Sequence, residues 1–466
     1  MTNGSDLSHE PVQAQRCVVP WGLLEGMRSP SVAPWWRSDI SLSPAGYLLP
    51  YGFGRSYGDC CMVDGTAIAM RHLDRLIEFD RDRGILRCEG GISLGALLDV
   101  VVPSGWMLPV VPGTQYVSVG GAIANDIHGK NHHHQGTFGD HVNAFELLRS
   151  DGVYTICRPT TNEVFATAGD KPIPAVSKVS TSASPSTLYE ATIGGLGLTG
   201  LITWAEIALA PLPTTQLIAE SLSFRDTTTF IDLCEESESQ YEYVVAWFDA
   251  WSFNNGRYRG ILHRARYDDS GVSAHVPSTR ITHFPKSVTR LMMNPWSIRR
   301  FNDLYWVSHR MRPRRSVQFR QHIFPLDSIE GWNAMYGPRG FFQFQCVLPT
   351  ESFRGIDELL QLIVDRGEGS FLGVLKRFGA KRSRGWLSFP MPGITLALDF
   401  PNRGESTRRL LADAGDIVAA HGGRIYPAKD ACMSGEVFRG GFPRWQELEA
   451  IRDPRFNSRF WQRVTH

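Results

Sequence analysis

Two glycine-rich segments have the residue types and spacing of anion-binding loops. The first follows the apolar run 47–51 and begins Gly-Phe-Gly-Arg. Glycine lets successive backbone N–H groups turn toward one acceptor, so such a loop can hold a phosphate or pyrophosphate. Its candidate binding residues are Gly52, Phe53, Gly54, Arg55, Ser56, Tyr57, Gly58 and Asp59.

The second segment, residues 112–129, combines a glycine pair with polar side chains at its end. Paired glycines allow a planar or phosphate-bearing ligand to approach the backbone closely. Each segment taken alone is also compatible with an ordinary tight turn. The candidate binding residues here are Gly113, Thr114, Ser118, Val119, Gly120, Gly121, Asn125, Asp126, Ile127 and His128.

A third segment, residues 194–200 (GGLGLTG), contains the G-x-G-x-x-G pattern of dinucleotide-binding folds. In a Rossmann fold this pattern opens a helix. Here it leads into residues 201–209, which alternate and are rich in strand-forming residues. We therefore expect a strand and no Rossmann NAD site. Three such loops along one chain are harder to explain as unrelated tight turns than any one of them taken alone.

A strand candidate at residues 340–348 carries Gln343 and Gln345. Because side chains alternate along a strand, both amides project to the same side. Two amides on an otherwise apolar strand suggest recognition of sugar hydroxyl groups.

The histidine run 132–134 predicts no metal site. Adjacent imidazoles on a loop do not easily converge on one ion, and no matched carboxylate or cysteine spacing accompanies them. The pair Cys60-Cys61 is interpreted as packing. Eight scattered cysteines without a Cys-x-x-Cys pair suit a reducing cytosol.

The elements that must position these residues fall into two regions, because 466 residues are too many for one ordinary core. In residues 47–210, turns separate short β-branched runs, while the later region mixes helical and strand patterns. The pattern predicts strands at 86–90, 118–123, 200–209, 340–348 and 394–400, and helices at 94–102, 230–238 and 356–365. Residues 166–187, rich in Ser, Thr, Ala and Pro, are interpreted as a surface insertion.

Charge and hydropathy exclude several classes of protein. The net charge is only +1, which gives no bulk attraction to nucleic acid. The longest uncharged stretch, 100–125, contains prolines that prevent a membrane-spanning helix. Residues 1–15 lack the order of a secretion signal. We expect a cytoplasmic protein.

Residues 280–320 form a basic, amphiphilic patch. They hold ten Lys or Arg against the single acid Asp303, interleaved with Met292, Met293 and aromatic residues. One interpretation is a solvated face. The other is a surface that docks on anionic lipid at the inner membrane face or on a phosphorylated substrate.

Six segments together resemble a known flavoprotein family. They are GFGRSYGD (52–59), VVPGTQYVSVGGAIANDIHGKNHH (110–133), GGLGLTG (194–200), YGPRGFFQFQCVLPT (336–350), LSFPMPG (387–393) and HGGRIYPAKD (421–430). They resemble the vanillyl-alcohol-oxidase/PCMH FAD-binding superfamily and, more closely, its decaprenylphosphoryl-β-D-ribose oxidase family. The resemblance spans most of the chain in the family's order.

This resemblance implies an α+β fold with a PCMH-type FAD-binding domain at 1–212. A substrate domain, built on an antiparallel sheet with flanking helices, would be inserted at 213–423. Residues 424–466 would return to the first domain. It implies FAD with its pyrophosphate over 52–59 and 113–121, its isoalloxazine near 125–128, and Ile202 and Tyr426 completing the site. Members that bind flavin covalently carry His where this chain has Arg55, so we expect noncovalent FAD.

The implied chemistry is oxidation of a secondary alcohol, in which a hydride passes to flavin N5 and negative charge gathers at the N1/C2 edge. Lys429, placed beside the flavin by the resemblance, would be a fixed cation there; the alternative is a base with a lowered pKa. Tyr57 and His128 would shape the flavin face and bind the substrate hydroxyl, or simply pack. Gln343, Gln345 and Lys376 would hold a substrate ribose and phosphate, unless Lys376 is merely exposed.

The substrate suggested by the resemblance is a polyprenylphosphoryl pentose oxidised at C2, a precursor of cell-wall arabinan. A separate NAD(P)H-dependent reductase would then return the keto sugar to the opposite epimer. The alternatives are an aldonolactone or alditol oxidase, a sugar-modifying oxidase of secondary metabolism, and a flavin-fold binding protein without turnover. Thr395 and Ala397 stand where the close family carries Asn and Cys, and the segment 34–51 lacks the usual preceding helix.

Overall fold

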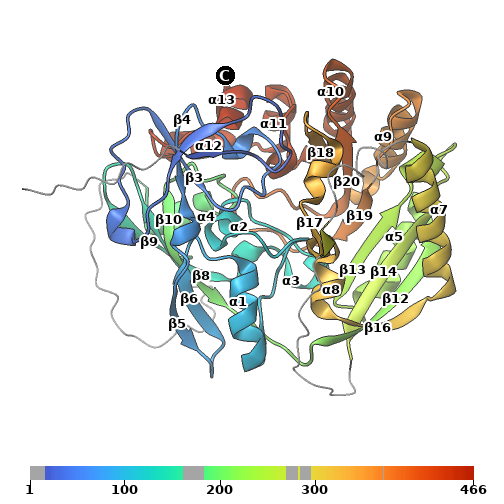
Figure 1. Ribbon diagram of the computed structural model, residues 1–466, viewed down its shortest axis with the longest axis horizontal. Helices are drawn as coiled ribbons and strands as arrows, with labels where there is room; N and C mark the ends of the chain where they lie inside the picture. Colours follow the sequence, from blue (N-terminus) through green and yellow to red (C-terminus); the bar gives the residue numbers. More distant parts are fainter. Residues whose placement is uncertain (1–15, 161–182, 269–281, 284–294, 371) are drawn as a thin grey trace, which may run out of the picture.

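The computed structural model describes residues 16–160, 183–268, 282–283, 295–370 and 372–466. Two halves lie side by side in Figure 1, one carrying the N-terminal strands and the other a large sheet. Most of the predicted insertion 166–187 and part of the basic patch 280–320, including Met292 and Met293, lie outside the described residues.

The first half contains a mixed four-stranded sheet and an antiparallel five-stranded sheet. Their strand orders are β1-β2-β4-β3 and β5-β6-β10-β8-β9. The predicted strands at 86–90 and 200–209 are confirmed as β6 and β10. The strands are β1 (Arg16–Val18), β2 (Ser29–Val32), β3 (Tyr47–Tyr51), β4 (Gly65–Ala69), β5 (Leu76–Asp80), β6 (Ile85–Glu89), β8 (Val142–Leu148), β9 (Tyr154–Cys157) and β10 (Leu201–Ala208); β7 (Trp106–Met107) pairs separately with β11 (Ala210–Pro211).

In the part of this half that the structure describes, these sheets are accompanied by α1 (Leu94–Val101), α2 (Val119–Ala124), α3 (His132–Gln135) and α4 (Pro185–Thr192). The predicted helix at 94–102 is confirmed as α1, but the predicted strand at 118–123 is wrong, because α2 occupies that segment. Ser118 caps this helix by accepting a hydrogen bond from the Gly121 N–H at 3.2 Å. Gly120 lets it approach the Gly90 carbonyl, which would lie 3.1 Å from any Cβ at this position.

The second half is built on an antiparallel sheet that has eight strands in the described residues, in the order β16-β12-β14-β13-β19-β20-β18-β21. The predicted strands at 340–348 and 394–400 are confirmed as β18 and β20, and the predicted helices at 230–238 and 356–365 as α5 and α9. The strands are β12 (Gln216–Phe224), β13 (Tyr243–Phe248), β14 (Gly260–Tyr267), β16 (Arg314–Gln318), β18 (Phe341–Leu348), β19 (Gly373–Phe378), β20 (Gly393–Pro401) and β21 (Arg424–Ile425); the helices are α5 (Thr227–Glu238), α7 (Pro295–Met311), α8 (Phe319–Ile323), α9 (Arg354–Asp365) and α10 (Glu405–Ala420); the short β15 (Thr282–His283) and β17 (Ile329–Glu330) pair apart from this sheet.

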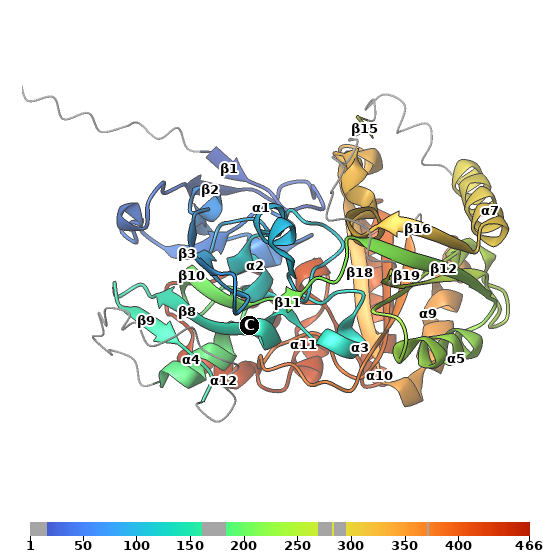
Figure 2. The same cartoon turned by 90° about the horizontal axis from the view of Figure 1, so that it is seen from below.

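The two faces of this sheet have different partners. Phe342, Phe344 and Leu348 of β18 belong to the core formed with α5, α9 and α10. Trp247 and Ile261, whose strand neighbours point into that core, pack instead against α7 on the opposite side (Figure 2). None of the helices in the described ranges is long and apolar enough to span a membrane.

After β21 the chain returns to the first half through α11 (Gly435–Gly441), α12 (Trp445–Ile451) and α13 (Arg459–Thr465). Arg463 on α13 pairs with Asp59 and Asp430, each at 2.8 Å, and thereby joins the first glycine loop to the segment before α11. β21 extends the large sheet two residues past the expected boundary at 423. The domain boundaries themselves remain predictions.

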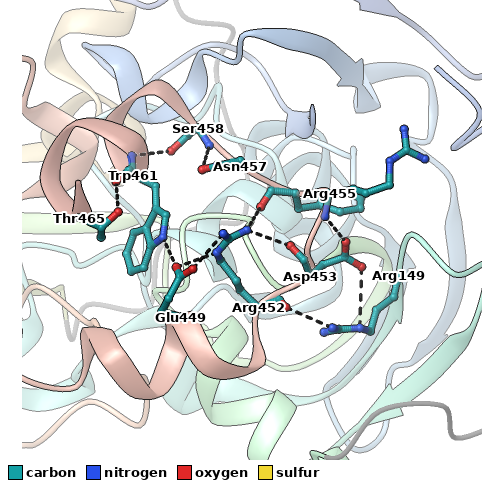
Figure 3. A network of polar contacts seen from close by, with 10 residues as sticks. Arg149, Glu449, Arg452, Asp453, Arg455, Asn457, Ser458, Trp461 and Thr465 are labelled. Atoms are coloured by element: carbon teal, nitrogen blue, oxygen red, sulfur yellow. Dashed lines mark hydrogen bonds and ion pairs between the residues drawn. The ribbon is translucent and has the colours of Figure 1, made fainter. Parts of the chain in front are cut away.

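A second polar network fixes this returning segment to β8 and to the third glycine loop (Figure 3). The Arg149 guanidinium donates to the carbonyls of Thr199 and Ile451 at 3.1 and 3.2 Å and lies 3.8 Å from the Asp453 carboxylate. Asp453 is 1% exposed and also accepts from the Ser150 N–H at 2.7 Å. One guanidinium at the end of β8 therefore satisfies acceptors from two separate segments, the third glycine loop and residues 451–453.

We expect Arg149→Met to lower the free energy of unfolding by about 3 kcal/mol, because it leaves buried carbonyls and a buried carboxylate without their donor. Urea denaturation with FAD at a fixed saturating concentration would measure this. The control is Arg409→Met, which removes an exposed pair with Glu405 and should cost less than about 0.5 kcal/mol. Equal effects of the two changes would contradict the role given to Arg149.

Candidate active site

One cavity of about 1030 Å³ is lined by the glycine loops of the first half and by the polar face of the large sheet. This volume is at the upper end of the range for ligand pockets. The predicted site residues that line it are Gly52, Phe53, Gly54, Arg55, Ser56, Tyr57, Gly113, Thr114, Ser118, Gly120, Gly121, Asn125, Ile127, His128, Ile202, Gln343, Gln345, Lys376, Tyr426 and Lys429. The fold thus brings most of the predicted set together.

Four predicted cofactor-binding residues do not line the cavity. Asp59 pairs with Arg463, and Gly58 packs so closely on the Asp430 carbonyl that a Cβ would lie 2.0 Å from it. Val119 is fully buried in the core of the first half. Asp126 accepts a hydrogen bond from the Gly139 N–H at 2.9 Å and one from the Ser388 hydroxyl. The structure therefore gives these four residues structural contacts.

The first glycine loop fits an anion. Within the described residues, nothing accepts a hydrogen bond from the backbone N–H groups of residues 53–56, although this loop lines the cavity. Gly54 has φ +63°, the left-handed conformation that turns successive N–H groups toward one point. The Arg55 guanidinium lies 4.0 Å from the Trp21 ring centroid. The loop can therefore hold a pyrophosphate, with a cation close by.

The second loop is held in place by hydrogen bonds where it borders the cavity. The Asn125 side-chain amide donates to the Gly121 carbonyl at 2.9 Å, and the Tyr426 hydroxyl donates to the Asn125 carbonyl at 3.0 Å. Tyr426 in turn stacks on Phe389 at 4.6 Å. These contacts fix the residues that border the cavity, as binding of a planar ring requires.

His128 is a neutral imidazole. Burial lowers its pKa well below the ordinary value, and the nearby Lys376 and Lys429 cations lower the pKa further. The Gln345 amide nitrogen lies 3.1 Å from Nε2. With that amide donating, the imidazole proton sits on Nδ1, which is buried and has no partner among the described residues.

Lys429 is a half-buried lysine above an aromatic ring. Its Nζ lies 3.9 Å from the Tyr57 ring centroid. Burial lowers the pKa of Lys429 to about 7, although the Asp399 carboxylate opposes this. Burial raises the pKa of Tyr57 well above its usual value, so Tyr57 remains a phenol. Near neutral pH, Lys429 is therefore partly protonated.

Sequence reasoning missed Asp399 on β20. This carboxylate is fully buried, accepts a hydrogen bond from the Gln343 amide at 2.6 Å and lies 3.3 Å from the Tyr336 hydroxyl. Burial raises its pKa to about 6, so it is largely ionised at neutral pH. A lone Asp in the apolar run 394–400 was the available signal, because an acid rarely stands on a central strand without a partner.

Sequence reasoning also missed Lys130, which follows the second loop and lines the cavity. Its Nζ donates to the His322 carbonyl. Burial lowers the pKa of Lys130 to about 7 and that of Lys376 to about 8. The cavity thus holds three lysines, and the predicted alternative that Lys376 is simply exposed is wrong.

The described residues contain no group of His, Cys, Asp and Glu side chains arranged to hold a metal ion. In the histidine run, His132 Nδ1 accepts from the Gly379 N–H at 3.2 Å, and His133 Nε2 lies 3.0 Å from the Tyr241 carbonyl. These two imidazoles therefore tie α3 to neighbouring segments.

Comparison with known proteins agrees with this geometry. A family described as FAD binding domain matches residues 46–158. The chain is 33% identical over 420 residues to decaprenylphosphoryl-β-D-ribose oxidase of Mycolicibacterium smegmatis, covering 87% of this chain and 85% of that protein. An uncharacterised protein of Streptomyces coelicolor is 30% identical over 380 residues, covering 78% of this chain and 96% of that protein. A putative D-arabinono-1,4-lactone oxidase of Neurospora crassa is 24% identical over 197 residues, covering 42% and 31%.

The backbone N–H groups of the first loop, which have no acceptor among the described residues, fit the pyrophosphate of FAD. The second loop borders the same cavity, where the ring system of FAD would lie. The FAD-domain match covers the same two loops. The chain is an FAD-dependent oxidoreductase acting on CH–OH groups, and it belongs to the decaprenylphosphoryl-β-D-ribose oxidase family of PCMH-type flavoproteins.

Proposed function

We propose that this enzyme oxidises the C2 hydroxyl of a polyprenylphosphoryl pentose to a keto sugar and holds its FAD noncovalently. One observation carries the proposal: a single cavity joins the two FAD loops to a sheet face with two amides, and three lysines line the same cavity. Amides suit sugar hydroxyls, and lysines suit a phosphate. The name of the mycobacterial relative supports the same substrate class.

Bound FAD would supply the hydride acceptor, and the protein would orient the sugar against it. The Gln343 amide nitrogen donates to Asp399, while that of Gln345 contacts His128 at 3.1 Å and donates to Thr395 at 3.3 Å. Both amide oxygens therefore remain to accept hydrogen bonds from sugar hydroxyls. Asp399 acts here as a positioning residue, because it fixes which way the Gln343 amide faces.

Lys429 is proposed to act as a cation. Oxidation of the alcohol delivers negative charge to the cofactor, and a fixed positive charge in a site of low dielectric stabilises it. The neutral His128 is proposed to border the reacting carbon, and its Nδ1–H is a donor still lacking an acceptor. The alternative function, oxidation of a free aldonolactone or alditol, is supported by the arabinonolactone oxidase match.

The substrate class is tested by anaerobic absorbance spectra of the yellow holoenzyme. We expect the flavin bands to bleach on addition of prenylphosphoryl ribose, because hydride transfer reduces the flavin, and to persist with free ribose. Rapid bleaching by a soluble polyol alone would instead establish the alternative function. Persistence of the oxidised spectrum with every sugar would reject both.

The role of Lys429 is tested by the pH dependence of the limiting rate of flavin reduction. Its pKa is lowered to about 7, so the ammonium form is complete below that pH and is lost as the pH rises through it. If the cation is required, the rate should fall with rising pH. Lys429→Arg should abolish this fall, and Lys429→Met should lower the rate about 100-fold. A rate that increases with pH, and is lost in Lys429→Arg, would make Lys429 a base.

Noncovalent binding is tested by acid precipitation of the holoenzyme. We expect all FAD in the supernatant, because Arg55 has no nucleophilic atom for a flavin bond. Burial also raises the pKa of Cys61, which lines the cavity, so this residue remains a thiol. Yellow precipitated protein would contradict this prediction.

A further inference from the structure

Asp126 lies in the second glycine loop, just after α2, between two residues that line the cavity, Asn125 and His128. It is fully buried, and its φ of +40° is a left-handed conformation that is uncommon outside glycine. A residue keeps such a conformation only where the surrounding contacts hold it. The contacts of Asp126 therefore help to decide where its two cavity-lining neighbours lie.

The two carboxylate oxygens of Asp126 are hydrogen-bonded to different segments. Oδ1 accepts from the Gly139 N–H at 2.9 Å, within the first half. Oδ2 accepts from the hydroxyl of Ser388, which lies between β19 and β20 of the large sheet. The second bond thus joins the two halves of the molecule beside the residues that border the cavity.

Two glycines allow these segments to meet closely. A Cβ at Gly139 would lie 2.8 Å from Asp126 Oδ1, and a Cβ at Gly385 would lie 2.4 Å from Ser388 Oγ. Only glycine leaves room for an approach of this kind. The chain is therefore built tightly around the Asp126–Ser388 hydrogen bond.

The position of Ser388 also determines where the next residue lies. Phe389 stacks on Tyr426 with ring centroids 4.6 Å apart, and its ring centroid lies 5.6 Å from that of His128. The Tyr426 hydroxyl donates to the Asn125 carbonyl at 3.0 Å. These contacts form a closed circuit that starts at Ser388 and returns to the second glycine loop.

We propose that Asp126 is a positioning residue for flavin reduction, acting through its hydrogen bond to Ser388. This bond holds the second glycine loop and the Phe389 ring in one arrangement, and thereby fixes Asn125 and His128 at the cavity wall. A displacement of about 1 Å at a reacting centre can cost about 100-fold in rate. The inference does not depend on which sugar is oxidised, because these residues border the position predicted for the isoalloxazine.

The hydrogen bond persists in both protonation states of Asp126. Burial, assisted by the nearby Asp140 carboxylate, raises the pKa of this carboxyl to about 7 against the hydrogen bonds that lower it. The ionised form accepts from both donors, whereas the acid form accepts from the Gly139 N–H and donates its own proton to the Ser388 oxygen. An asparagine amide offers the same acceptor and donor as the acid form. Asp126→Asn therefore keeps both bonds.

The test is Ser388→Ala, which removes the donor and leaves Asp126 its bond to Gly139. We expect the visible circular dichroism of the bound FAD to change. The limiting rate of anaerobic flavin reduction by prenylphosphoryl ribose should fall about 10-fold, with a half-saturation concentration within about twofold of the wild type. Asp126→Ala should lower the rate at least as much, and adding Ser388→Ala to it should have no further effect. Asp126→Asn should restore the rate to within about threefold of the wild type.

The matched control is Thr227→Val, which also removes a hydroxyl that donates to a carboxylate, that of Asp357 at 2.9 Å, but between α5 and α9 and away from the cavity. It should lower stability yet keep the wild-type dichroism and rate. Equal changes in Thr227→Val, wild-type behaviour of Ser388→Ala, or no rescue by Asp126→Asn would each overturn the proposal. If prenylphosphoryl ribose does not reduce the wild-type flavin, the proposed function fails, and the dichroism of the same variants still decides the role of Asp126.

Discussion

The alternation of side chains along β18 and β20 is the constraint on which the rest of the structure depends. A strand presents successive residues to opposite sides, so one face of the large sheet can be wholly apolar while the other is polar. Phe342 and Phe344 join the helical core, and between them Gln343 faces the cavity. A one-residue slip in register would place both amides in the core and both rings in the cavity. Packing of α5, α9 and α10 therefore fixes the substrate face as firmly as any contact within the site.

The second organising feature is the unbalanced charge of the cavity. Protein interiors normally pair or neutralise buried charges. Among the described residues, however, three lysines line one cavity, and of these only Lys429 is influenced by a buried carboxylate, Asp399. Such an arrangement lowers the stability of the empty protein and is relieved by anionic ligands. FAD and a phosphorylated substrate would then stabilise the folded state by mass action as well as by shape. Stability and function are therefore opposed in this cavity, as is common at active sites.

The sequence predicted those parts of the site that can be recognised from residues adjacent in the sequence. Glycine loops and the Gln343–Gln345 alternation are local patterns, and the structure places most of them around one cavity. The segment 118–123 was mistaken for a strand because its β-branched residues obscured the cap at Ser118. Asp399 and Lys130 were missed because their partners, Gln343 and His322, lie 56 and 192 residues away in sequence. Burial by distant segments decides whether such a residue is an ordinary surface charge or part of a site.

The pairing of Arg463 with Asp59 and Asp430 has a consequence for the order of synthesis. The Tyr57 N–H donates to the Ala428 carbonyl at 2.9 Å, so the first glycine loop is held in place by a segment made some 370 residues later. A ribosome that has released only the first half has therefore exposed the FAD loops without the lysine, the tyrosine and the arginine clamp that complete them. We therefore expect flavin capture to follow the emergence of this late segment. Until then the nascent chain exposes surfaces that are buried in the finished protein, and this is the interval in which it most needs protection from aggregation.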